Sequence, residues 1–200
     1  IVDSAEQRRK LILSVLTDEP VQYYDLLQQA RMNEDSEVVH YAATAMAQIS
    51  KQADLALQQY ERQYQAAPQD PAVLAEYSAY LEEYLASGLA QGRAAELQRC
   101  KLEQLLQQQQ TRKRNYLLGC RLASVQLQLE EYDAAELTLA ELVRRWPVRE
   151  TPWLLRLRSA AARRDGAAVR EVLRQMERNH VYLSAAGRRE VDFWRKGGTS

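Results

Sequence analysis

The sequence contains few of the residues that interrupt helices. Glycine occurs seven times and proline five times in 200 residues. Few positions therefore force a turn or remove a backbone hydrogen-bond donor, and most of the chain is free to be helical. At 46% hydrophobic and 27% charged residues, the chain can bury a sizeable core. These numbers favour an all-α protein.

Long apolar runs, cysteine and histidine are scarce as well. No stretch is apolar enough for long enough to cross a membrane, and no signal peptide is present. Cys100 and Cys120 lie inside helical patterns without a second cysteine nearby, so we expect buried free thiols in a reducing compartment. His40 and His180 have no ligand-spaced partners, and we expect His40 to be a packing residue. We predict no metal site and no cofactor.

The chain also lacks an excess of charge of either sign. Lys and Arg number 27 and so do Asp and Glu, so the chain as a whole carries no charge suited to a polyanion. Arginines concentrate in residues 151–200, but Glu171, Glu177 and Glu190 alternate with them at helical spacing. This pattern favours an ion-paired, solvated helix face, with binding of RNA or anionic lipid as the alternative.

Catalytic motifs are absent from the sequence. It has no phosphate-binding glycine loop, no nucleophile elbow and no kinase signature. The acidic pairs Glu82-Glu83 and Glu130-Glu131 are adjacent in sequence, so on a helix their carboxylates point in different directions. We therefore expect a protein that is not an enzyme and has no small-molecule substrate.

What is present is a helical pattern that repeats, most clearly in residues 116–153. Leucine, valine and alanine recur there at helical spacing, stop at Glu130–Asp133, and resume until Pro147. Such a pair of amphipathic helices cannot cover both of its apolar faces alone, so it predicts a stack of helix pairs.

Turn and cap residues divide the rest of the chain into further helices. We expect helices starting near Ala5 and at Pro20, and one long helix over residues 36–66, with a bend near Ser50 as the alternative. Further helices are expected from Pro71 to Ser87 and from Arg93 to about Gln109. Further helices are expected to begin at Pro152 behind a Thr151 cap, after Asp165-Gly166, and behind a Ser184 cap, and residues 197–200 are expected to fray. We divide the chain into N-terminal helices (1–67), repeats (68–182) and a capping helix with its tail (183–200).

The central unit resembles a tetratricopeptide repeat. The family's small residue, alanine, aromatic and closing proline match Ala123, Ala135, Tyr132 and Pro147 here. Two positions depart from the family: Leu142 stands where a small residue is usual, and Gln126 where tyrosine is common. Weaker copies lie on either side, in residues 50–180. The resemblance implies a tetratricopeptide-like α-solenoid of antiparallel helix pairs.

The N-terminal part carries a second resemblance. The runs NEDSEVVHYAATAM and AEYSAYLEEYLASGLAQGR are similar to the cytoplasmic repeat region of PelE-like proteins of the Pel exopolysaccharide apparatus. This resemblance implies a protein at the cytoplasmic face of the bacterial inner membrane, with its membrane anchor in helices ahead of Ile1. It also implies assembly with PelD, the glycosyltransferase PelF and the membrane protein PelG.

Two groups of residues are candidates for partner binding. Tyr77, Tyr80 and Tyr84 form a stripe on one expected helix; such a stripe is usually core, but tyrosine also anchors partners, and Tyr80 and Tyr84 are our preferred candidates. Arg121 and Arg158 fall where peptide-clamping tetratricopeptide proteins bind a carboxylate. Two arginines alone disfavour such a clamp, so a protein surface is the expected partner.

The sequence thus predicts a non-catalytic scaffold for protein partners, best placed within a Pel synthase or secretion complex. A soluble peptide-binding adaptor unrelated to polysaccharide is the first alternative. A helical module that binds RNA or anionic lipid is the second, and steep salt dependence would distinguish it.

Overall fold

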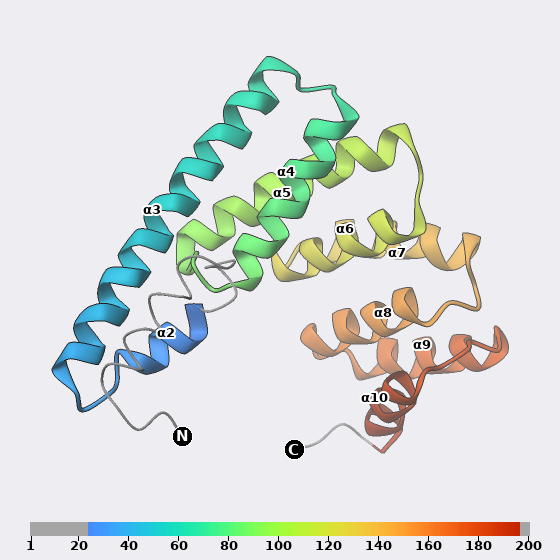
Figure 1. The fold of residues 1–200 in the computed structure, drawn as a ribbon. Helices are drawn as coiled ribbons and strands as arrows, with labels where there is room; N and C mark the ends of the chain where they lie inside the picture. The colour runs from blue at the N-terminus through green and yellow to red at the C-terminus, as the bar shows by residue number, and fades with distance from the viewer. Residues whose placement is uncertain (1–23, 197–200) are drawn as a thin grey trace. The chain divides into compact units, whose positions relative to one another are not determined.

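The computed structural model describes residues 24–196, and this part of the chain is all-α (Figure 1). Within it no strand forms, and a single isolated bridge pairs Arg149 with Tyr182. Neighbouring helices in the chain pack against each other as pairs. The described helices are α2 (Tyr24–Ala30), α3 (Ser36–Ala66), α4 (Pro71–Ala86), α5 (Gly92–Arg112), α6 (Tyr116–Gln128), α7 (Tyr132–Arg145), α8 (Glu150–Ala162), α9 (Gly166–Arg178) and α10 (Ala185–Arg195). The prediction of a repeat-like, all-α fold is confirmed; the helix expected near Ala5, the start expected at Pro20 and the frayed tail lie outside the described residues.

The chain forms two compact units, residues 1–102 and 103–200, whose boundary falls inside α5. The sequence analysis divides the chain just before Pro68, but this residue lies in the turn that joins α3 to α4, and these two helices pack together in unit 1. Likewise, α10 packs on α8 and α9 within unit 2. Prolines and polar turns therefore mark helix ends in this chain, and the compact units are decided by which helices pack together.

Side-chain caps fix most helix starts. The carboxylate of Asp70 accepts from the backbone N–H of Ala72, with Pro71 opening α4, and the Ser184 hydroxyl accepts from Gly187 N–H at the start of α10, as the sequence predicts. The start of α8 differs. It begins at Glu150 behind Arg149, which makes no side-chain cap, so Thr151 lies inside the helix.

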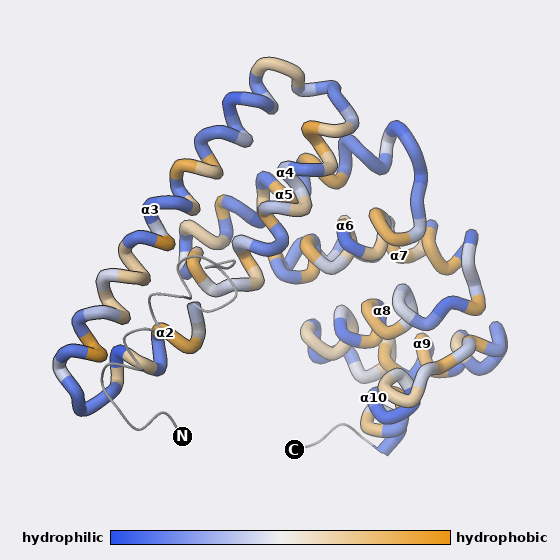
Figure 2. Tube along the Cα trace, viewed as in Figure 1, coloured by the Kyte–Doolittle hydropathy of each residue, from blue (hydrophilic) through white to orange (hydrophobic). Residues whose placement is uncertain are grey.

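The long helix α3 forms as predicted and presents a narrow, small-residue stripe to its neighbours. Figure 2 shows apolar residues recurring along it once per turn between polar ones. Its buried residues are Val38, Ala42, Ala45, Met46, Ile49 and Ala53. Ala43, which the sequence pattern placed in the stripe, is exposed, and so is His40, which was expected to pack. Both point away because the buried face of the helix is centred on Ala42 and Ile49.

A stack of tyrosine rings joins α3 to α4 in unit 1. The ring of Tyr60 stacks on Tyr77 at 5.6 Å and on Tyr80 at 4.8 Å, and Tyr80 stacks in turn on Tyr84 at 6.2 Å. Tyr64 closes the other end, 6.4 Å from Tyr77. Offset stacking of this kind adds to the free energy of burying the rings. The stack explains why the two helices pair across the Pro68 turn.

Lys101 of α5 and Glu61 of α3 form the polar end of this stack. The Lys101 ammonium lies 2.9 Å from the Glu61 carboxylate and 4.1 Å from the centre of the Tyr64 ring, and the Tyr77 hydroxyl donates to Glu61 at 3.1 Å. Burial raises the pKa of Glu61, but the hydrogen bond and charge of Lys101 and the hydrogen bond from Tyr77 outweigh it, so this pKa lies below its ordinary value.

Glu61→Gln should remove a pH-dependent part of unit 1 stability. A lowered pKa stabilises the fold above the unfolded value of about 4.3, and this contribution is lost as the pH falls through the lower folded-state value. Wild-type stability should therefore drop more steeply on acidification than that of the variant. Urea midpoints measured across the acidic range test this, with Glu76→Gln, at an exposed position of α4, as the control. Parallel curves for wild type and Glu61→Gln would contradict it.

Unit 2 consists of two helix pairs and a closing helix. Helix α6 packs on α7, α8 on α9, and α10 on both α8 and α9, while α7 and α6 also contact α8. Fully buried leucines, Leu139 and Leu142 of α7 and Leu157 of α8, lie at the centre of these contacts. The Trp153 indole donates to the carbonyl of Pro147 and so fixes the turn between the pairs.

Gly119 explains one departure from the tetratricopeptide pattern. A Cβ added at Gly119 would lie 2.7 Å from the Cδ2 atom of Leu142. The large residue on α7 is therefore accommodated by the absence of a side chain on α6. The Leu142 side chain fills the space that a side chain at position 119 would otherwise take, as close packing requires.

Gly119→Ala should lower the free energy of unfolding by about 1–3 kcal/mol, because overpacking outweighs alanine's higher helix propensity. Leu142→Ala alone should lower the free energy of unfolding by about 2–5 kcal/mol. The double variant should lower it by less than the sum of the two single effects. Gly166→Ala is the control, since a Cβ there meets only the end of Arg170 at 3.6 Å. Denaturant unfolding measures all four, and additive costs would show that the two positions are not coupled.

Candidate functional site

The predicted tyrosines lie inside unit 1 and not on its surface. Tyr77 is 3% exposed and Tyr84 9% exposed, and Tyr80 is half-buried with its hydroxyl donating to the carbonyl of Ala53. Burial, followed by the charge of Glu61, raises the pKa of Tyr77, and burial, followed by its tyrosine neighbours, raises that of Tyr80 to about 12. The rings of Tyr60 and Tyr64 pack against them from α3. The stripe is core, and its residues are not an exposed anchor.

The two predicted arginines lie on the first helices of consecutive pairs in unit 2. Arg158 of α8 is exposed, and its guanidinium binds both carboxylate oxygens of Glu190 on α10, at 2.8 and 2.7 Å. The hydrogen bonds that Arg158 donates to Glu190 raise the pKa of Arg158. Arg121 of α6 is half-buried. Arg158 lines the groove described next, and Arg121 does not.

An open groove lies between α6 and α8, which we call the α6–α8 groove. Its volume is about 300 Å³, and its walls combine aliphatic, aromatic and small polar side chains. The residues that line it are Ser124, Leu127, Gln128, Tyr132, Leu155, Arg158, Ser159 and Ala162. The groove exists because Ser124, Ser159 and Ala162 are small where the helices approach. Sequence reasoning found only Arg158, since the small residues show no pattern of their own.

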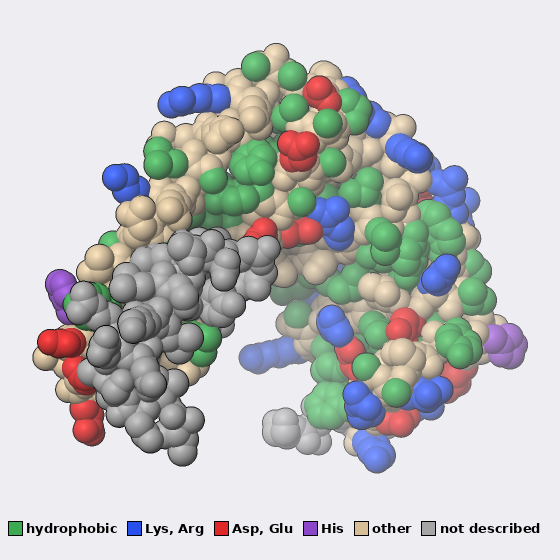
Figure 3. Space-filling view, viewed as in Figure 1, with side chains coloured by type: hydrophobic (Ala, Val, Ile, Leu, Met, Phe, Trp, Pro, Cys, Tyr) green, Lys and Arg blue, Asp and Glu red, His purple; other side chains and the backbone are tan. Residues whose placement is uncertain are grey.

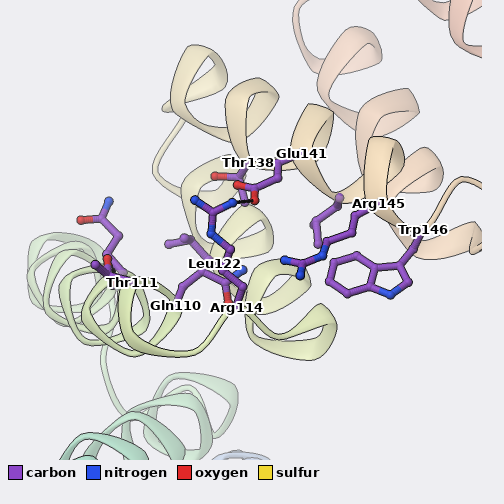
Figure 4. A pocket seen from close by; sticks show the side chains of 10 residues that line it. Gln110, Thr111, Arg114, Leu122, Thr138, Glu141, Arg145 and Trp146 are labelled. Atoms are coloured by element: carbon purple, nitrogen blue, oxygen red, sulfur yellow. Dashed lines mark hydrogen bonds and ion pairs between the residues drawn. The ribbon is translucent and has the colours of Figure 1, made fainter.

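A second hollow lies between α5 and α7, with Leu122 of α6 in its wall, and we call it the α5–α7 pocket (Figure 4). Its volume is about 380 Å³. The side chains that line it are Gln107, Gln110, Thr111, Arg114, Leu122, Thr138, Glu141, Leu142, Arg145 and Trp146. Figure 4 shows Arg114 reaching from the turn after α5 to Glu141 on α7, and these two side chains form an ion pair.

Hydrogen bonds between three helices fix the wall of this pocket. Buried Gln126 of α6 donates to Glu103 of α5 at 3.1 Å and accepts from the Thr138 hydroxyl of α7 at 2.9 Å, and Gln107 donates to the same Glu103 at 2.7 Å. This network accounts for the second departure from the repeat pattern, Gln126. Burial, and then the charge and hydrogen bond of Glu103, raise the pKa of Glu131.

A row of rings and guanidinium groups begins with Arg145 and Trp146 in the lining of the pocket and continues outside the lining to Tyr116 and Arg149. The guanidinium of Arg149 lies over the Tyr116 ring at 5.6 Å, Tyr116 meets Trp146 edge to face at 5.4 Å, and Arg145 lies over Trp146 at 5.3 Å. Cation–π contacts of this kind hold long arginine side chains in place. Sequence analysis missed the pocket because residues 107–114, 122 and 138–146 meet only after α5, α6 and α7 pack.

Several ion pairs lie elsewhere in unit 2. Figure 3 shows acidic and basic side chains alternating over α8–α10. The pairs there include Arg156 with Glu136, Arg174 with Glu171 and Arg195 with Glu177. These pairs agree with the ion-paired face that the sequence pattern favours.

No family model, curated protein or solved structure matches this chain. Within residues 24–196, no cluster of three or more His, Cys, Asp or Glu side chains could hold a metal ion. None of the helices described in that range is long and apolar enough to span a membrane. The class of protein that the fold defines is an all-α, repeat-like protein, with the α6–α8 groove and the α5–α7 pocket in unit 2.

Tyr84→Ala should destabilise unit 1 by about 3–5 kcal/mol, as aromatic truncations in cores do. Tyr84→Phe should destabilise unit 1 much less, because it keeps the ring of the stack. Thermal unfolding followed by circular dichroism compares the two. A small cost for Tyr84→Ala would mean that the ring is not part of the core in solution.

Proposed function

We propose that this chain is a non-catalytic scaffold that binds a protein partner in the α6–α8 groove. The observation that carries the proposal is the groove itself, which is open to solvent and lined by residues that pack well against protein. Leu127, Leu155 and Tyr132 offer apolar surface, and Ser124 and Gln128 offer hydrogen bonds at its edge. An apolar centre with a polar rim is the usual anatomy of a protein interface.

Arg158 acts in this proposal as part of the groove wall rather than as an anion clamp. Both nitrogens that would hold a carboxylate already bind Glu190. A partner carboxylate would have to displace that contact, which makes a clamp for a free peptide terminus the weaker choice. The proposed partner therefore presents a mostly apolar segment, such as one face of a helix.

For the partner's identity we propose the Pel synthase complex at the cytoplasmic face of the bacterial inner membrane, with PelD, PelF and PelG as candidates. This part rests on the resemblance of residues 33–46 and 75–93 to PelE-like proteins and on the tetratricopeptide-like pairing of the helices. A peptide-binding adaptor outside that apparatus uses the same groove and differs only in what it binds.

Ala162→Trp tests the groove, because Ala162 is exposed at its edge and an indole there would fill it. Ala167→Trp is the matched control, since Ala167 is exposed on α9 and does not line the groove. Purified PelD, PelF and detergent-solubilised PelG are each tested for binding by biolayer interferometry. We expect one of them to bind, with affinity reduced about tenfold or more by Ala162→Trp and unchanged by Ala167→Trp.

The outcomes separate the two parts of the proposal. Binding that Ala162→Trp leaves intact would overturn the groove as the site. Absence of binding to all three Pel proteins would overturn the Pel assignment. Circular dichroism of each variant confirms that the helices are intact before binding is compared.

A further inference from the structure

The α5–α7 pocket carries an excess of positive charge that the protein does not neutralise. Among the charged side chains that line it, Arg114 pairs with Glu141, and Arg145 forms no ion pair with any residue in the described part of the chain. Arg149 forms none within that part either, and its guanidinium lies over the Tyr116 ring, which contacts Trp146 of the lining. Both arginines are exposed, Arg145 at the end of α7 and Arg149 immediately before α8. A chain with no net charge thus places one unpaired cation in this hollow and a second beside it.

We infer that the α5–α7 pocket binds an acidic segment of a protein partner, in which carboxylates flank an aliphatic side chain. The cations on its border match the carboxylates. Leu122, Leu142 and the Trp146 ring supply apolar surface for the aliphatic group, and Gln110 and Thr111 supply hydrogen bonds for a peptide backbone.

The ion pair between Arg114 and Glu141 controls access to this charge. Arg114 comes from the turn after α5 and Glu141 from α7, so their pair closes the pocket from one wall to the other (Figure 4). Arg114 is 58% and Glu141 38% exposed, so water screens the pair and its net contribution to stability is small. An incoming carboxylate therefore competes with Glu141 for Arg114 at little cost.

Nucleic acid fits the pocket less well than an acidic peptide. Sequence-tolerant binding of single strands relies on bases stacking on exposed ring faces along a basic track. One face of Trp146 is covered by Arg145 and its edge by Tyr116, while Arg149 covers a face of Tyr116.

This binding site is independent of the α6–α8 groove. The two share no lining residue. A scaffold could therefore hold one partner in the groove and an acidic segment in the pocket at the same time. The test of this inference is independent of the test of the proposed function, because its variants do not change the residues of the groove.

The test uses fluorescence anisotropy with a fluorescein-labelled peptide of alternating Glu and Leu residues. The charge-reversed variant is Arg145→Glu/Arg149→Glu. The matched control is Arg188→Glu/Arg189→Glu, which makes the same change of net charge at exposed positions of α10. We expect the pocket variant to weaken binding about tenfold or more and the control to change it less than about twofold.

A second pair of variants tests for a change of affinity in the opposite direction. Glu141→Gln should tighten binding of the acidic peptide by about threefold, because it frees Arg114. Asp133→Asn, which removes one exposed carboxylate elsewhere on α7, should leave the affinity nearly unchanged. This arm remains informative if the double variant folds poorly.

Three further probes separate acidic peptide from other anions: the same peptide with Lys in place of Glu, an oligouridine RNA, and phosphatidylglycerol vesicles. We expect none of them to show binding that depends on Arg145 and Arg149. RNA or vesicle binding abolished by the pocket variant, with the acidic peptide unaffected, would overturn the inference. Equal losses in the pocket variant and the control would do the same, since they would reflect net charge alone.

Discussion

Every helix described in this chain has one apolar face that only a neighbouring helix can cover, and the rest of the structure depends on this constraint. In unit 1 the cover is the tyrosine stack between α3 and α4, with Ala42 and Ala45 bringing α3 close to α2. In unit 2 it is a run of leucines facing glycine and alanine. Because the faces are narrow, each helix leaves most of its surface free for polar and charged residues.

In each unit a polar side chain at the edge of or inside the core is held by partners from neighbouring helices. Glu61 is bound by Lys101 and Tyr77, and Gln126 joins Glu103 to Thr138. A buried polar group without partners costs the fold its desolvation energy, whereas a satisfied network specifies how the helices align. These two networks thus fix the register of α3 against α5 and of α6 against its neighbours. Apolar packing alone would specify these registers less strictly.

The α6–α8 groove and the α5–α7 pocket of unit 2 differ in chemistry, and this difference supports two different kinds of contact. The groove is lined by small and apolar residues, which suit one face of a helix. The pocket is lined by amide side chains and by Arg114 and Arg145, which suit an acidic segment. A scaffold gains specificity when several such contacts must be made together, because each alone is weak.

The sequence by itself determined the helices and the all-α class, because helix starts and ends depend on neighbours in the chain: Asp70 and Pro71 fix the start of α4, and Ser184 that of α10. It also contained the two departures from the repeat pattern, Leu142 and Gln126. Only the tertiary structure decided that Gly119 makes room for Leu142, that α3 buries the tyrosine stripe, and that Arg145 and Trp146 border a pocket. Such features depend on which side chains meet across helices, and spacing along a single helix does not specify the facing residue.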